Sequence, residues 1–127
     1  MTEDERRARG AELAGRLFRG APRTEPLPPE MMRHTLVHLF GDVWQGEELA
    51  LEERSLVTCA ALVALGREAE QRLHFRGARN LGIERQKIEA LIIHVGHYGG
   101  WPVAASALRV LAEVWNEMDA ASHSPAQ

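Results

Sequence analysis

A run of ten residues from Leu56 to Leu65 is apolar at every position except Thr58. A helix that is hydrophobic all round is normally buried, so this run predicts a helix covered on every face. Gly66 interrupts the pattern, and residues 67–79 are strongly polar, with leucine and phenylalanine on one stripe. A buried helix beside a charged amphipathic helix predicts a helical core and its outer wall.

Helical spacing of apolar residues recurs along the rest of the chain, and no segment shows the alternation of a strand. The spacing predicts further helices over 3–19, 31–40, 84–98 and 102–118, and Pro102 suits the first turn of the last one. With 127 residues, the chain is long enough for one domain with a single core. The fold class is therefore predicted as all-α, with roughly six helices.

Residues 20–30 are rich in proline and cannot continue a helix. They predict an extended linker that separates an N-terminal arm from the body of the protein. The predicted organisation is an N-terminal helical arm with its linker at 1–30, a helical domain at 31–118 and a disordered tail at 119–127.

Charge and cysteine content exclude several classes of protein. The net charge is -3 and no basic patch dominates, which argues against nucleic-acid binding. The single cysteine excludes an internal disulfide and a metal site built from cysteines alone. The N-terminus has no apolar core of a signal peptide, and the longest apolar run is too short for a membrane helix. We expect a soluble, cytoplasmic protein.

Several histidines are candidates for proton transfer. His74 lies between Arg72 and Arg76, and two neighbouring cations should lower its pKa toward a range useful to an acid or base. The alternative is a histidine at an oligomer interface. His94 and Tyr98 are four residues apart, with His97 beside Tyr98, so these side chains either form part of a site or make hydrogen bonds at a helix end.

A metal site is a weaker interpretation of the same histidines. His34 and His38 have the i,i+4 spacing of a helical zinc site, but a third ligand is missing nearby. His74, His94 and His97 could in principle bind zinc, nickel or copper. We predict no metal and no cofactor. Trp44, in a turn at 41–46, is either part of the core or a platform for a ligand.

Three segments together resemble the carboxymuconolactone decarboxylase family, which also contains alkyl hydroperoxidase D-like antioxidant proteins. They read G-D-V-W at 41–44 with E-R-S-L-V-T-C-A-A-L-V-A-L-G-R at 53–67, L-H-F-R-G-A-R-N-L-G-I at 73–83, and E-A-L-I-I-H-V-G-H-Y-G-G-W-P at 89–102. The resemblance covers about residues 36–115. It implies an alkyl hydroperoxidase D-like helical bundle that assembles as a homo-oligomer, a trimer or hexamer.

The hydroperoxidase branch of this family carries a glutamate, a C-x-x-C pair and a histidine four residues after the second cysteine. Aligned on His74, these positions fall on Ser55, Arg67 and Glu70, and none of them matches. The one thiol, Cys59, lies in the apolar run, where burial should raise its pKa and make it inert. These observations argue against dithiol peroxide reduction.

The decarboxylase branch needs neither thiol nor cofactor, and the resemblance therefore implies a cofactor-free carboxy-lyase. Its substrate would be a small carboxylated lactone from aromatic-compound degradation, or a related unsaturated carboxylate. The implied catalytic residues are His74, His94 and Tyr98. The residues implied to bind substrate are Arg54, Arg72, Arg76, Trp44 and Trp101. The alternative is an antioxidant or stress-related relative, or a non-catalytic oligomer that has lost the cysteine pair.

Overall fold

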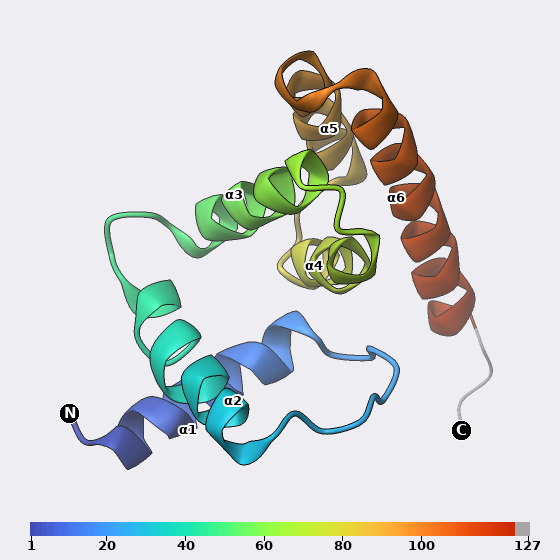
Figure 1. Ribbon diagram of the computed structural model, residues 1–127. Coiled ribbons are helices and arrows are strands. Elements are labelled where there is room, and N and C mark those ends of the chain that lie inside the picture. The colour runs from blue at the N-terminus through green and yellow to red at the C-terminus, as the bar shows by residue number, and fades with distance from the viewer. Residues whose placement is uncertain (124–127) are drawn as a thin grey trace.

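The computed structural model describes residues 1–123 and is shown in Figure 1. Six α-helices account for most of the described chain, and this part of the protein contains no strand, which confirms the all-α prediction. A π-helix and a 3-10 helix lie between α2 and α3. The elements are α1 (Glu3–Leu17), α2 (Pro29–Arg33), η1 (His34–Leu39), η2 (Val43–Gln45), α3 (Leu51–Ala64), α4 (Glu68–Asn80), α5 (Arg85–Gly99) and α6 (Trp101–Ser122).

The main core lies between α3, α4, α5 and α6. Its fully buried side chains include Phe75 of α4, Ile88 and Ile92 of α5, and Leu111 of α6. The turn between α5 and α6 passes through Gly100, whose φ of 112° suits glycine because other residues rarely adopt it. Pro102 follows in the first turn of α6, as predicted.

The prediction that α3 is covered on every face is wrong for the single chain. Only Ser55, Cys59 and Val63 of this helix are buried. On another side Val57 is 58% exposed, and Leu65, just after the helix, is 72% exposed. The reason is that α3 packs mainly on α4, α5 and α6, and this packing leaves Val57 and Leu65 open to solvent.

The N-terminal arm packs against the body of the protein. α1 contacts η1 and α4, and Leu13, Leu17, Phe40 and Trp44 form a second, smaller core there. Gly10 allows the close approach, since a Cβ at this position would lie 1.9 Å from the carbonyl oxygen of Leu36. In Figure 1 the linker runs as a long loop from the end of α1 to α2.

Asn80, the last residue of α4, holds the end of α1 in place. Its Nδ2 group donates to the carbonyl oxygens of Leu17 at 2.9 Å and Arg19 at 3.0 Å. These carbonyls lie at the C-terminal end of α1, where a helix leaves acceptors without intrahelical partners. The arm is therefore tied to the helix that carries His74.

The C-terminal helix is longer than predicted. α6 continues through Ser122, beyond the predicted end at Met118, because alanines at 120 and 121 favour helix over a disordered tail. The rest of the predicted tail, residues 124–127, lies outside the described residues. None of the described helices is both long enough and apolar enough to cross a membrane.

Candidate functional site

His74 lies in the middle of α4, on the side that faces α1. Its ring meets the Phe18 ring edge-on, with centroids 5.3 Å apart, and the Trp44 ring almost in parallel, at 6.2 Å. Phe40 contacts both of these aromatics, at 5.7 Å from Phe18 and 5.5 Å from Trp44. His74 therefore lies in an aromatic enclosure formed by α1, η1 and η2.

This enclosure keeps the imidazole neutral. Burial lowers the pKa of His74 to about 4, and the Glu70 carboxylate one turn earlier opposes this shift only in part. The Nδ1 atom is buried and has no hydrogen-bond partner among the described residues. At neutral pH the site therefore holds an uncharged imidazole with one unused ring nitrogen.

The predicted direction of this pKa shift is confirmed, but the predicted cause is wrong. Residues two apart on a helix do not face each other, so Arg72 and Arg76 lie on other sides of α4 than His74. Arg72 pairs instead with Glu113 and Glu117 of α6. Burial of the ring, and not neighbouring cations, lowers the pKa.

Arg54 supports the turn that carries Trp44. Its side chain is only 15% exposed, and one terminal nitrogen donates to the carbonyl oxygen of Gly46 at 3.0 Å. The Glu48 carboxylate lies 3.9 Å from the same nitrogen, and the Arg54 Nε atom is buried without a partner among the described residues. Of the eight predicted site residues, His74, Trp44 and Arg54 thus come together around the turn at 43–46.

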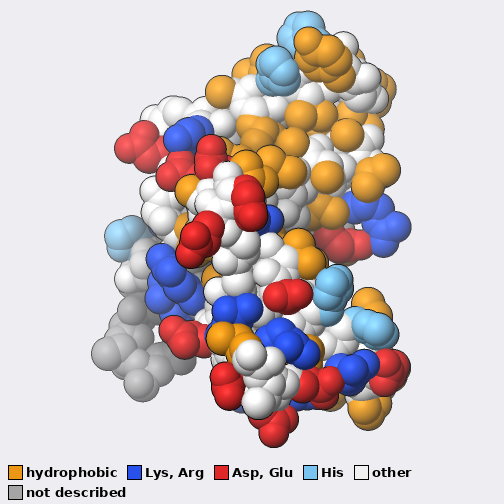
Figure 2. Space-filling model, turned by 90° about the vertical axis from the view of Figure 1, so that its left-hand side faces the viewer, with side chains coloured by type: hydrophobic (Ala, Val, Ile, Leu, Met, Phe, Trp, Pro, Cys, Tyr) orange, Lys and Arg blue, Asp and Glu red, His pale blue; other side chains and the backbone are white. Residues whose placement is uncertain are grey.

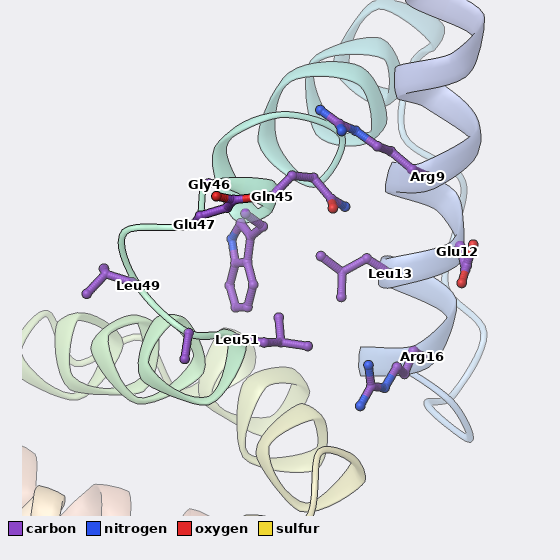
Figure 3. Close-up of a pocket in the computed structure, with 11 residues that line it drawn as sticks. Arg9, Glu12, Leu13, Arg16, Gln45, Gly46, Glu47, Leu49 and Leu51 are labelled. Atoms are coloured by element: carbon purple, nitrogen blue, oxygen red, sulfur yellow. The ribbon is translucent and has the colours of Figure 1, made fainter. Parts of the chain in front are cut away.

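A cavity of about 480 Å³ lies between α1 and the segment from Trp44 to Leu51 (Figure 3). Leu13 and Leu51 form apolar parts of its wall. The charged residues of the lining are two cations and two carboxylates, Arg9, Arg16, Glu12 and Glu47. Trp44 lines this cavity and also stacks on His74, whereas His74 itself is not part of the lining. The indole of Trp44 is therefore the link between the cavity and the histidine.

Two of the predicted arginines line a different groove. Arg72 and Arg76 border a space of about 380 Å³ together with Leu73 of α4 and with Pro22 and Thr24 of the linker. Neither arginine lines the cavity beside Trp44. Their predicted role in a common site with His74 is therefore not supported by the arrangement of the single chain.

The predicted pair His94 and Tyr98 lies at the other end of the molecule. Their ring centroids are 5.2 Å apart in the last turns of α5, and Tyr98 is 83% exposed. Trp101 follows at the start of α6 and is also exposed. The turn between α5 and α6 is at the top of Figure 1, whereas α1, the helix that His74 faces, is at the bottom. The single chain does not bring the two groups together.

The sequence analysis missed two residues that shape the enclosure, Phe18 and Phe40. Phe18 follows α1 directly, and the proline-rich linker after it had indicated a detached arm. The signal that could have placed Phe18 near His74 is Asn80, in the N-L-G segment at 80–82. The Asn80 side chain donates a hydrogen bond to the end of α1.

The one cysteine is buried and its pKa is raised, as predicted. Cys59 is fully buried, and burial raises its pKa to about 12. Its Sγ atom donates to the carbonyl oxygen of His74 at 3.6 Å, so it contributes to the contact between α3 and α4. A thiol that remains protonated at neutral pH is a poor nucleophile.

Histidine and carboxylate side chains do not gather into a metal site within residues 1–123, where no three potential ligands lie close enough to bind one ion. His34 lies instead 3.3 Å from the Glu30 carboxylate at the surface.

These features define an all-helical domain in which a neutral histidine is enclosed by aromatic rings next to a small cavity. A family model described as the carboxymuconolactone decarboxylase family matches residues 29–113, so the chain belongs to this family. The matched region contains α2 through most of α6. It leaves α1 outside.

Curated relatives include two decarboxylases. The chain is 39% identical over 79 residues to a 4-carboxymuconolactone decarboxylase of Acinetobacter baylyi, an alignment that covers 62% of this chain and 59% of the relative. It is 33% identical over 79 residues to a nitrosuccinic acid decarboxylase of Metarhizium robertsii, covering 62% and 55%. A third relative, peroxisomal protein 2 of Saccharomyces cerevisiae, is 36% identical over 64 residues, covering 50% and 23%. The chain thus spans less than two thirds of each relative.

Proposed function

We propose that this protein is a cofactor-free decarboxylase acting on a small carboxylated lactone or a related unsaturated carboxylate. Family membership and the two relatives named as decarboxylases support the reaction class. The observation that carries the proposal is His74, a neutral imidazole whose buried Nδ1 atom has no hydrogen-bond partner among the described residues. Its ring stacks on the Trp44 indole, which lines a cavity of small-molecule size.

The reaction needs an electron sink in the substrate and a proton at the end. In a carboxylated butenolide, the bond between the ring carbon and the carboxylate breaks and carbon dioxide leaves. The electron pair moves through the ring double bond to the lactone carbonyl oxygen, which gives an oxyfuran enolate. A proton added to carbon then regenerates a lactone, so each turnover consumes one proton.

His74 is suited to deliver that proton. In the free protein its pKa of about 4 leaves it uncharged at neutral pH. An anionic substrate beside the ring would raise this pKa, because a nearby negative charge favours the imidazolium form. Substrate and proton would then bind together, and transfer of the proton to carbon would return His74 to its neutral state.

The substrate ring is proposed to bind in the cavity between α1 and the segment from Trp44 to Leu51. Since His74 does not line this cavity, productive binding requires the Trp44 indole to turn away from its stacked position. Arg54 would act by holding the Trp44 turn through its bond to Gly46. His94, Tyr98 and Trp101 lie outside this site in the single chain.

A non-catalytic or stress-related oligomer remains the second candidate. Two observations favour it: the separation of His94 and Tyr98 from His74, and the uncovered apolar face of α3. A thiol peroxidase reaction has less support, because the Cys59 thiol has a pKa of about 12. Under either candidate we propose self-association into a trimer or hexamer. A cytoplasmic location and a role in aromatic-compound degradation remain predictions.

The test is turnover of 4-carboxymuconolactone by the purified protein, followed by carbon dioxide release and ring absorbance. His74→Gln should lower kcat by about a hundredfold or more if this residue supplies the proton. His34→Gln is the matched control, since this exposed histidine pairs with Glu30 at the surface.

If the folded wild-type protein does not turn over 4-carboxymuconolactone, the result favours the second candidate, a non-catalytic or stress-related oligomer. Turnover that survives His74→Gln would remove this histidine from the mechanism. Loss of turnover in His94→Gln would instead indicate a site that a second copy of the chain completes.

A further inference from the structure

The two arginines at the cavity beside Trp44 differ in what they already bind. Arg9 donates from Nε to the Gly41 carbonyl oxygen at 2.7 Å, and a terminal nitrogen lies 3.7 Å from the Asp42 carboxylate. Arg16, two turns later on α1, has no carboxylate within 4.0 Å in the described part of the chain. Arg16 is therefore the cation whose charge the protein leaves uncompensated at this cavity.

Arg16 is also directed into the cavity. Figure 3 shows its guanidinium group pointing from α1 toward Leu51, whereas Glu12, one turn earlier and also in the lining, points away from Leu51. Leu13 and Leu51 present apolar surface next to it. The cavity thus has a cation without a carboxylate partner beside apolar surface, while the Glu47 carboxylate of its lining lies on the far side, next to Gly46 (Figure 3).

Decarboxylation of a dicarboxylate treats the two carboxylates differently. The departing group loses its charge as neutral carbon dioxide forms, so a cation paired with it would stabilise the substrate more than the transition state. The retained carboxylate keeps its charge throughout, and pairing it with a cation fixes the orientation without opposing the reaction. An apolar wall therefore suits the departing carboxylate, and a guanidinium group suits the retained carboxylate.

We propose that Arg16 binds the retained carboxylate of a dicarboxylate substrate, while the departing carboxylate lies against the apolar wall formed with Leu13 and Leu51. This inference rests on the proposed function and adds to it a residue that determines substrate specificity. Because α1 lies outside the family match at 29–113, the residue that selects for a second carboxylate comes from a segment outside that match. Asn80 supports this role by fixing the end of α1.

The test is calorimetric binding of the ring-saturated analogue of carboxymuconolactone to the full chain. This probe keeps both carboxylates but lacks the double bond that accepts electrons, so it is not turned over. A second probe carries a methyl ester in place of the retained carboxylate. The variants are Arg16→Gln and, as a matched control, Arg7→Gln, since Arg7 lies on the same helix but pairs with Glu3 at 3.9 Å.

We expect Arg16→Gln to weaken binding of the diacid by about tenfold, the loss typical of a charge-assisted pair. The ester should bind wild type and Arg16→Gln equally, and Arg7→Gln should behave as wild type. Equal diacid binding by Arg16→Gln and Arg7→Gln would overturn the inference, as would no diacid binding by wild type.

Turnover separates this inference from the proposed function. If wild type decarboxylates 4-carboxymuconolactone and Arg16→Gln does so with unchanged KM, the function stands and the role of Arg16 is wrong. If Arg16→Gln loses diacid binding but wild type shows no turnover, the carboxylate site is supported and the reaction is not.

Discussion

At the scale of single residues, His74 shows how burial can set a protonation state that the neighbouring sequence does not explain. The two arginines beside it in the chain point elsewhere, and Phe18 and Trp44, which do contact it, carry no charge. The ring is neutral because water is excluded from part of it. This has a consequence for stability as well as for chemistry.

We predict that stability depends on pH through His74. The pKa is about 4 in the folded chain and near its ordinary value of 6.5 when unfolded, so between these values only the unfolded chain binds the proton. The free energy of unfolding should therefore fall as pH drops from 6.5 toward 4, by about 1–2 kcal/mol at pH 5. Urea unfolding at pH 7 and pH 5 measures this, and His74→Gln should lose less stability than wild type. An identical loss in both proteins would contradict the prediction.

At the scale of elements, α1 depends on a close backbone approach that one of its two interior glycines permits. Gly10 faces η1, where a Cβ would collide with the Leu36 carbonyl oxygen, whereas nothing lies within 4 Å of a Cβ at Gly15. Glycine inside a helix is by itself less favourable than alanine. The structure gives only Gly10 a packing reason.

Substituting the two glycines with alanine should have opposite effects. Gly10→Ala should destabilise the protein by about 1–3 kcal/mol through overpacking. Gly15→Ala should stabilise it by about 0.5–1 kcal/mol, because alanine is the better helix former and meets no neighbour. Chemical denaturation of the two variants measures both effects, and the prediction fails if Gly10→Ala proves as stable as Gly15→Ala.

The same element marks the limit of what the sequence predicts. Apolar periodicity located the six α-helices, because that pattern depends on the residues of the helix alone. It predicted one helix over 31–40, where the structure has α2 followed by the π-helix η1, and it did not indicate η2. It could not show which element covers an apolar face. Phe18 and Leu17 at the end of α1 contact His74 and Asn80, which lie more than fifty positions later in the sequence. The sequence therefore indicated His74, Trp44 and Arg54 as site residues but not the aromatic enclosure around His74.

At the scale of the whole molecule, an apolar surface remains uncovered. Figure 2 shows apolar side chains gathered toward the end of the molecule where α3 and α5 lie in Figure 1. The exposed large side chains of this region are Val57 and Leu65 at α3, Ile93 and Tyr98 of α5, and Trp101 of α6. Monomeric proteins rarely leave a large contiguous apolar patch open to water.

We predict that this surface mediates self-association. Leu65→Lys should shift the protein from an oligomer toward a 14.2 kDa monomer, because a buried unpaired charge is costly at an interface. Leu27→Lys, at an exposed leucine of the linker, is the matched control and should leave the assembly unchanged. Sedimentation velocity at several concentrations distinguishes the species. A wild-type protein that sediments as a monomer throughout would refute the prediction.

The hydrogen bond from Asn80 to Leu17 also bears on the order in which the chain folds. It joins residues 63 positions apart, whereas most contacts within and between α3, α4, α5 and α6 are closer in sequence. Closing a loop of this size is entropically unfavourable until both ends are structured. We therefore expect α1 to dock late, onto helices that have already assembled. Until that step, the imidazole of His74 remains in contact with water, so the residue acquires its unusual acidity only as folding is completed.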